Sequence, residues 1–115
     1  PYNSVYLNAL GHLYFQRGCA KLRSKNNNVT DDFQKAEHNY YRGYCLEKNE
    51  TNKHATIPRN LGLLYLMQDK PEKALFMLEK AISLNPSMSF VHFYRAVAIK
   101  MLCMKDAWSC AQMFD

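Results

Sequence analysis

The sequence predicts an all-α protein, an α-solenoid of antiparallel helix hairpins. Apolar residues recur at helical spacing, one pattern of small and large residues repeats along the chain, and breaks are few. The 115 residues include only four prolines and four glycines, which favours long regular elements over a loop-rich β sandwich. Hydrophobic residues make up 48% and charged residues 22%, as is typical of a folded domain. The length favours a single domain.

The clearest helical signal lies in residues 55–88, where apolar residues recur at helical spacing on both sides of a short polar break. Pro71 suits the first turn of the second helix, where its missing N–H has no partner to lose. Asn85-Pro86 ends that helix, because the residue before a proline avoids the α region. Pro58 fits if the first helix begins near residues 56–57. The segment therefore predicts two short helices joined by a tight turn.

The spacing of small and large residues in this hairpin is specific. Gly62 and Ala74 are small enough for two helices to approach closely, and Tyr65 and Leu78 fill the space between them. The pattern closely resembles the tetratricopeptide repeat, a unit of about 34 residues. One hairpin cannot bury its apolar face alone, so the resemblance implies neighbouring hairpins. The residues assigned to this packing along the chain are Leu10, Gly11, Tyr14, Ala36, Leu61, Gly62, Tyr65, Ala74, Leu78, Ala81 and Pro86.

The upstream residues repeat the pattern with a longer connection. Leu10-Gly11 and Tyr14 match the first helix and Ala36 and Tyr40 the second, but about 13 extra residues separate them. The segment CAKLRSK that begins at Cys19 is predicted to extend the first helix. Asn26-Asn27-Asn28 is then expected to break it, and Thr30 or Asp31 to cap the next helix.

Downstream, residues 90–102 form a strong helical pattern with Ala96 at the small position. Met104-Lys105-Asp106 is predicted to be the turn, and Ala107 to lie near the start of a last helix. The whole chain, 1–115, is thus predicted as one array. Repeat one is 4–54 with an insertion at about 18–32, repeat two is 55–88, and repeat three is 89–115 and truncated. The chain starts at Pro1 without Met and ends inside a hairpin, so we expect a part of a longer array.

The resemblance implies a right-handed superhelix with a concave groove lined by the first helix of each repeat, and such surfaces bind partners. The groove positions that it carries over are apolar for the most part, which predicts an apolar helix or extended segment as ligand. Further helices of the same chain remain the alternative occupant. The predicted groove residues are Asn8, His12, Phe15, Arg59, Leu63, Leu66, Met67, Phe90, Phe93, Val97, Lys100 and Met101.

The sequence thus predicts a protein–protein interaction scaffold, a subunit of a larger assembly. Some members of the family grip acidic chaperone tails through a carboxylate clamp of Lys, Asn and Arg. The corresponding positions here are Asn8, His12, Asn60, Phe90 and Tyr94, of which only Asn60 fits, so no such clamp is expected. The net charge of +5 and the 13% of aromatic residues leave an alternative, a repeat module that contacts RNA in a ribonucleoprotein.

No residue set predicts an enzyme, and no cofactor or metal is expected. The four histidines, His12, His38, His54 and His92, show no ligand spacing. Cys19, Cys45, Cys103 and Cys110 form no CxxC pair, and buried free thiols in a reducing compartment are the expected state. No apolar run approaches the length of a membrane span. We therefore expect an intracellular protein, first of all a cytoplasmic one, with the nucleus or an organelle left open.

Overall fold

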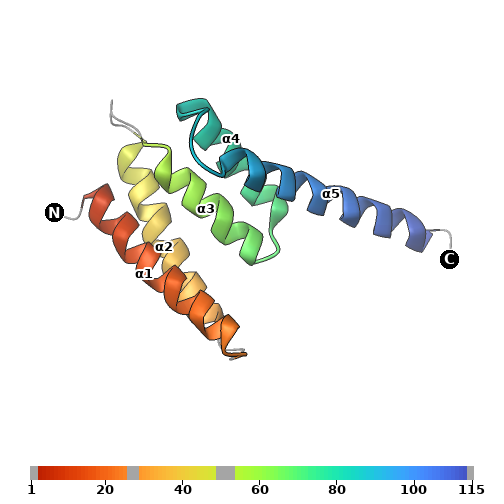
Figure 1. Ribbon diagram of the computed structural model, residues 1–115, viewed down its shortest axis with the longest axis horizontal. Coiled ribbons are helices and arrows are strands. Elements are labelled where there is room, and N and C mark those ends of the chain that lie inside the picture. Colours follow the sequence, from red (N-terminus) through yellow and green to blue (C-terminus); the bar gives the residue numbers. More distant parts are fainter. Residues whose placement is uncertain (1–2, 26–28, 49–53, 114–115) are drawn as a thin grey trace.

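The computed structural model describes residues 3–25, 29–48 and 54–113, with side chains described as far as residue 107. Within these residues the chain forms five helices and no strand (Figure 1). They are α1 (Ser4–Arg23), α2 (Thr30–Glu47), α3 (Thr56–Met67), α4 (Pro71–Leu84) and α5 (Val91–Met113). The predicted all-α array of helix hairpins is confirmed. The segments that were expected to break the chain at Asn26-Asn27-Asn28 and around 49–53 lie outside the described residues.

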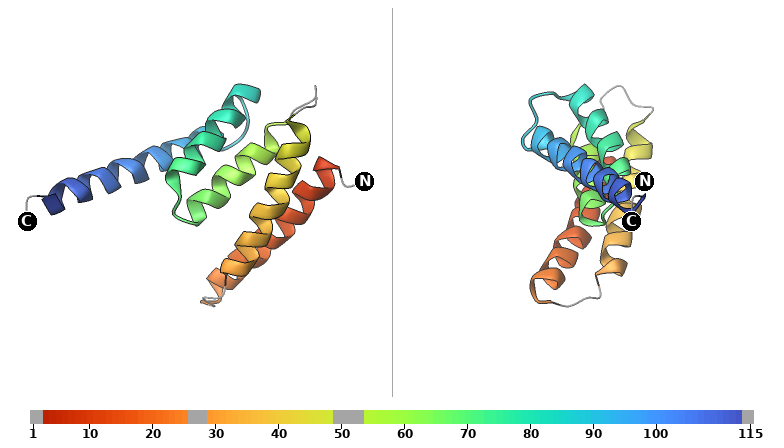
Figure 2. Two further views of the ribbon diagram at one scale, coloured as in Figure 1. Left: turned by 180° about the vertical axis from the view of Figure 1, so that it is seen from behind. Right: turned by 90° about the vertical axis from the view of Figure 1, so that its right-hand side faces the viewer.

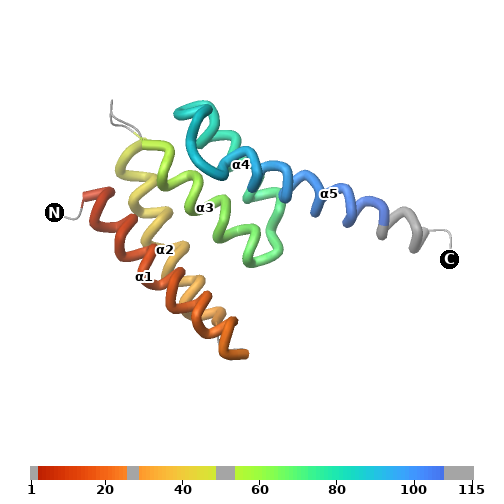
Figure 3. The backbone as a smooth tube through the Cα atoms, viewed as in Figure 1, coloured from red at the N-terminus to blue at the C-terminus, as the bar shows by residue number. Residues whose placement is uncertain are grey.

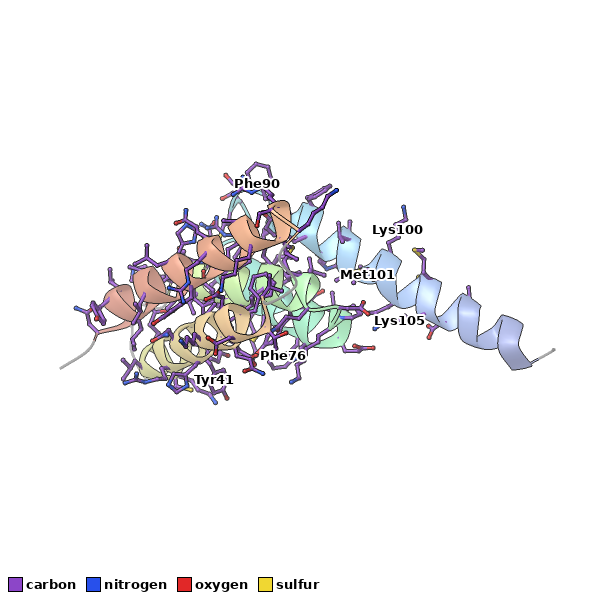
Figure 4. The ribbon with its side chains drawn as sticks, turned by 90° about the horizontal axis from the view of Figure 1, so that it is seen from below. Tyr41, Phe76, Phe90, Lys100, Met101 and Lys105 are labelled. Carbon is purple, nitrogen blue, oxygen red and sulfur yellow. The ribbon has the colours of Figure 1, made fainter. Side chains whose placement is uncertain are left out.

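The helices form two hairpins, α1–α2 and α3–α4, followed by α5. Each helix packs against the next along the chain, and α3 also contacts α1 and α5. Seen from below, α1 and the start of α5 lie along one edge of the molecule, whereas α2 and α4 lie along the other (Figure 4). The views from behind and from the side show the same succession of hairpins (Figure 2). The array therefore has two different faces, which we call the α1–α3–α5 face and the α2–α4 face.

In each hairpin the two helices pack closely where a glycine of one helix faces a large side chain of the other. A Cβ added to Gly62 would lie 2.6 Å from Leu78, and one added to Gly11 would lie 2.6 Å from the ring of Tyr40. Both of these large side chains are fully buried. The two helices approach as closely as they do because no side chain stands between their backbones at these two points.

The extra residues of the first hairpin lengthen its helices. α1 has 20 residues and α2 has 18, against 12 and 14 for α3 and α4. The added turns contain a further contact between a glycine and a large side chain. A Cβ on Gly18 would lie 2.5 Å from the buried ring of Phe33. The insertion predicted at about 18–32 is thus mainly an extension of the hairpin rather than a loop.

An ion pair secures this extension. The carboxylate of Asp32 is completely buried, and it receives Nε of Arg17 at 2.9 Å and Nζ of Lys21 at 2.7 Å. Both cations come from α1 and the carboxylate from α2. The pKa of Asp32 lies below its ordinary value, chiefly because Lys21 donates to the carboxylate, with Arg17 adding to this effect and burial opposing it. The pair therefore holds the far end of the hairpin together in its charged form.

The predicted cap of α2 is wrong. The N-cap residue is Val29, which makes no side-chain hydrogen bond, while Thr30 is already the first helical residue. Asp31 instead pairs with Lys35 one turn along α2, at 3.2 Å. Asp31 and Asp32 both lie in the first turn, where negative charge stabilises the positive end of the helix dipole without a cap.

The predicted boundaries of the second hairpin agree with the structure. α3 begins at Thr56, α4 begins at Pro71 and its C-cap is Asn85. Between the helices, Lys70 N donates to Tyr65 O at 2.8 Å and Asp69 N donates to Leu66 O at 3.1 Å. This bonding pattern is a Schellman motif. It places Asp69 in the left-handed region, with φ at 58°.

The turn predicted at Met104-Lys105-Asp106 is wrong, because α5 continues through it to Met113. These three residues include neither glycine nor proline, so nothing local ends the helix there. Ala96, assigned to the small position of a third hairpin, is exposed because no described helix folds back onto it. α5 projects beyond both hairpins (Figure 3). The radius of gyration is accordingly 15.5 Å, against about 13 Å for a compact domain of this size.

Gly62→Ala is expected to destabilise the protein by about 1–3 kcal/mol, because the new methyl group overlaps the buried Leu78 side chain. This loss outweighs the gain of about 1 kcal/mol in helix propensity that alanine brings. Urea unfolding measures the difference. Gly43→Ala is the matched control: its Cβ would lie 3.1 Å from Ile57 Cδ1, an end of a side chain that can yield, so its effect is smaller. Equal losses in the two variants would contradict the role of the close contact.

Asp69→Gly is expected to raise the free energy of unfolding by about 1 kcal/mol, because glycine adopts positive φ without the steric penalty of a Cβ. Asp69→Ala is the matched control, since it removes the carboxylate but keeps the Cβ in the left-handed region. Thermal unfolding of the two variants separates the effects. A gain shared by both would assign the stabilisation to the lost side chain instead.

Asp32→Asn is expected to lower the free energy of unfolding at neutral pH, and the difference between the variant and the wild type is expected to depend on pH. A carboxyl group whose pKa is lowered in the folded protein adds to the free energy of unfolding. This stabilisation is fully present above the unfolded pKa of about 4, and it is lost as the pH falls through the folded pKa. The stability of the wild type therefore approaches that of the variant in acid. Thermal unfolding across the acid range tests this, with the exposed Asp31→Asn as control. A deficit that stays constant with pH would contradict the ion-pair assignment.

Candidate partner-binding face

The predicted groove residues come from three helices on one face. α1 contributes Asn8, His12 and Phe15, α3 contributes residues 59–67, and α5 contributes residues 93–101, with Phe90 directly before it. α3 contacts both α1 and α5, whereas no contact joins α1 to α5 among the described residues. The structure therefore brings the set together as a band across α3, which lies between the other two helices in Figure 4.

The band is apolar and open to solvent at its two ends. Phe90 is 68% exposed and Phe93 63%, at the start of α5, and Val5 is 69% exposed near the start of α1. On α3, Met67 is 43% exposed. Large apolar side chains with this exposure are candidates for contact with a partner. The remaining apolar positions of the set are half-buried: Leu63, Leu66, Val97 and Met101.

Two of the predicted groove residues also belong to the core. Phe15 is half-buried, and its ring stacks on that of Phe33 at a centroid distance of 5.9 Å. Leu66 packs against the buried cluster that the hairpins share. These two side chains support the face from below, so a substitution there would damage the fold as well as any binding.

The polar groups in the middle of the band bind one another. Asn60 on α3 donates from its side-chain nitrogen to Oδ1 of Asn8 on α1 at 2.9 Å, and Arg59 approaches Oδ1 of Asn60 at 3.5 Å. The Asn60–Asn8 bond ties the second hairpin to the first. One side-chain atom of each amide is therefore already engaged within the protein.

The start of α5 holds an aromatic cluster. The ring of Phe90 stacks on Tyr94 at 6.3 Å, and Phe93 meets Tyr94 edge-on at 6.0 Å. Phe90 adopts a positive φ of 65°, which is rare for a bulky residue. His92 Nε2 donates to Pro86 O at 2.7 Å and ties the first turn of α5 to the preceding turn. These contacts bring the two exposed rings together with Tyr94 at the start of α5.

A buried carboxylate joins the two hairpins beside this face. Glu47, the last residue of α2, accepts a hydrogen bond from Ser4 Oγ at 2.9 Å, and Nδ1 of His54 lies 3.0 Å from the same oxygen. A small hollow of about 160 Å³ lies next to the three. The hydroxyl and the imidazole both face the carboxylate rather than each other. The group therefore fastens α1, α2 and the segment before α3 together.

Little else in the described residues is equipped for chemistry. Cys19, Cys45 and Cys103 are free thiols, but the expected burial is wrong for Cys45 and Cys103, which are exposed because they lie on the outer sides of their helices. Burial raises the pKa of the half-buried Cys19, which makes it less reactive. No three or more of the described His, Cys, Asp and Glu residues are grouped so that they could hold a metal ion. None of the helices, as far as they are described, combines the length and apolar character that crossing a membrane requires.

The residues assigned to repeat packing are mostly interior. Gly11, Ala36, Leu61, Gly62, Tyr65, Ala74, Leu78 and Ala81 are buried, whereas Leu10 and Tyr14 are half-buried and Pro86 is exposed. Burial and the hydrogen bond to Glu37 both raise the pKa of Tyr65, with burial the larger effect. Pro86 ends α4 without packing into the core, because helix termination needs only its ring and missing N–H.

The sequence did not point to the α2–α4 face, where the structure shows a second concentration of aromatic residues. Tyr41 on α2 and Phe76 on α4 are 51% and 59% exposed, and both line a hollow of about 540 Å³. Figure 4 places them at the edge opposite to Phe90. The sequence carried one sign of this concentration that was not used: the outer face of a surface helix is normally polar, and Tyr41 and Phe76 depart from that pattern.

Comparison with known proteins gives one match. The family model of the tetratricopeptide repeat matches residues 59–88, which cover most of α3, all of α4 and the turn after it. The predicted resemblance is thus confirmed for the second hairpin. The predicted bounds of repeats one and three stay predictions. No curated protein and no solved structure matches the chain.

Proposed function

We propose that this chain, whose second hairpin is a tetratricopeptide repeat, is a protein–protein interaction scaffold that holds an apolar helix or extended segment across its α1–α3–α5 face. Such repeats generally mediate contacts between proteins. The observation that carries the proposal is the set of exposed apolar side chains that this face presents, Val5, Met67, Phe90 and Phe93. We further propose that the chain acts as a subunit of a larger assembly inside the cell, without a catalytic role.

The energetics favour an apolar ligand. Burying one of these side chains fully against a partner contributes about 1.5–3 kcal/mol. Nδ2 of Asn60 and Oδ1 of Asn8 are paired with each other, so a ligand that required these two atoms would first have to break that bond. An amphipathic helix that lays its own apolar side chains on the face avoids this penalty.

The aromatic cluster at the start of α5 is the expected anchor of the interface. Binding energy in protein interfaces concentrates in a few aromatic residues that lose little freedom on binding. Phe90 and Phe93 both contact Tyr94, so their rings are already ordered in the free protein. The same contacts explain how a small face could bind with useful affinity.

Cross-linking tests which face meets a partner. A photoreactive phenylalanine analogue placed at Phe93 is expected to cross-link a separate protein in cells, and the same analogue placed at Leu46 on α2 serves as the control. Leu46 is 44% exposed and belongs neither to the predicted groove nor to the hollow on the α2–α4 face. Cross-links that remain within the chain itself, or that form equally from both positions, would contradict the proposal.

A second test measures the affinity of the chain for the cross-linked protein. Phe93→Glu combined with Met67→Glu is expected to weaken binding by about 700-fold if the two losses add, because each lost anchor costs about 2 kcal/mol, which is about 30-fold. Both residues are exposed, so the fold is expected to persist in a circular dichroism melt. Leu46→Glu is the control and should bind as the wild type does, because this exposed residue of α2 lies outside both candidate sites. Wild-type affinity in the double variant would refute the α1–α3–α5 face as the interface.

The RNA-contacting alternative depends on aromatic rings that can stack on bases. The half-buried ring of Tyr14 is instead covered by the protein's own cations, because Arg17 and Lys35 lie over it at 5.5 and 5.6 Å from its centroid. This ring is therefore not free to stack on a base, which favours the protein-binding proposal. RNA affinity that falls steeply with salt would favour the alternative.

A further inference from the structure

The hollow on the α2–α4 face is a site in its own right. It lies between α2 and α4, has a volume of about 540 Å³ and is open to solvent. Pockets of roughly 300–1,000 Å³ accept small ligands or single side chains. None of the groove residues predicted from the sequence lines it. It therefore belongs neither to the α1–α3–α5 face nor to the function proposed above.

Three aromatic rings shape this hollow. Tyr41 comes from α2, Phe76 from α4 and Tyr65 from the end of α3. Tyr41 and Phe76 are more than half exposed, whereas Tyr65 is buried. Figure 4 shows Tyr41 and Phe76 on the same edge of the molecule. Two exposed rings above a buried one form an open aromatic recess rather than a packed core.

Two carboxylates and one ammonium group line the recess, those of Glu37, Glu72 and Lys73. The lining thus has one more negative than positive charge, although the chain as a whole has a net charge of +5. A second lysine, Lys80, approaches the ring of Phe76 without belonging to the lining. The hydroxyl of Tyr65 donates to Oε2 of Glu37 at 3.1 Å. This bond fixes one carboxylate against one ring, so that a ligand would meet both at once.

The rings of this recess already attract ammonium groups. Nζ of Lys73 lies 5.8 Å from the centroid of Tyr65, and Nζ of Lys80 lies 5.3 Å from that of Phe76. A cation over an aromatic face is stabilised by the ring quadrupole. Both lysines are exposed, so a competing cation can displace them without leaving a buried charge unpaired.

We propose that the recess formed by Tyr41, Tyr65 and Phe76, with Glu37 and Glu72 at its sides, binds the cationic side chain of a partner protein, an arginine or a lysine with or without methyl groups. The rings supply cation–π attraction and the carboxylates supply opposite charge. Since the recess lies on the opposite face from Phe90, a partner can occupy it while another segment occupies the α1–α3–α5 face.

Choline and neohexanol, its uncharged tert-butyl analogue, are the probes. They match in shape and differ in charge, so a cation site must separate them. Choline is expected to shift the amide NMR signals of residues around Tyr41 and Phe76, and neohexanol to leave them nearly unchanged at the same concentration. Equal shifts with both probes would show an apolar hollow without preference for cations and would overturn the proposal.

Variants assign the effect to individual groups. Tyr41→Ala combined with Phe76→Ala is expected to weaken choline binding about fivefold or more, and Glu72→Gln to weaken it less. Lys73→Met removes the resident competitor and is expected to strengthen binding. Phe90→Ala and Phe93→Ala, which delete comparably exposed rings on the opposite face, should bind choline as the wild type does.

Two outcomes would refute the site even if choline binds. One is equal weakening in the Phe90→Ala control, which would indicate binding to any exposed ring. The other is weaker binding in Lys73→Met, which would show that Lys73 helps to form the recess rather than competing for it. A circular dichroism melt of each variant confirms that it is folded. Both the probes and the recess are independent of the partner-binding proposal, so the failure of one leaves the other standing.

Discussion

The close approach of a glycine in one helix to a bulky side chain in its partner is the contact on which each hairpin depends. Leu78 against Gly62 and Tyr40 against Gly11 set how near the paired backbones lie. Phe33 against Gly18 continues the same contact in the longer first hairpin. Because a protein interior is close-packed, fixing this distance also fixes which side chains can fill the space around it. The lengthened first hairpin shows that the contact can be repeated along a helix pair without changing the architecture.

A different kind of contact joins the two hairpins, namely hydrogen bonds that are buried or partly buried. Glu47 draws Ser4 and His54 together at one end of the first hairpin, and Asn60 bonds to Asn8 across the neighbouring helices. A buried carboxylate that lost its partners would be strongly penalised, so these bonds specify one arrangement of the two hairpins.

That arrangement gives the molecule two surfaces of different chemistry. The α1–α3–α5 face presents exposed apolar and aromatic side chains and has its central amides paired. The α2–α4 face presents a recess in which rings and carboxylates lie together. Both surfaces follow from the alternation of first and second helices, because each hairpin contributes one helix to each face. The two proposed sites lie on opposite faces, so their proposed ligands do not compete for space.

The sequence by itself predicted the hairpin at residues 56–84 and the packing of Leu78 against Gly62, because proline positions and the spacing of small residues act locally. It also assigned Phe90 and Phe93 to a partner-binding groove, and that assignment stays a prediction. The turn predicted at Met104-Lys105-Asp106 was wrong. The segment resembled a turn, but it contains no glycine or proline that would end α5. Only the tertiary structure decided that Phe15 and Leu66 support the core. It alone brought Tyr41, Tyr65 and Phe76 from three helices into one recess. Such groupings depend on how helices distant in the chain pack together, and no local pattern records that.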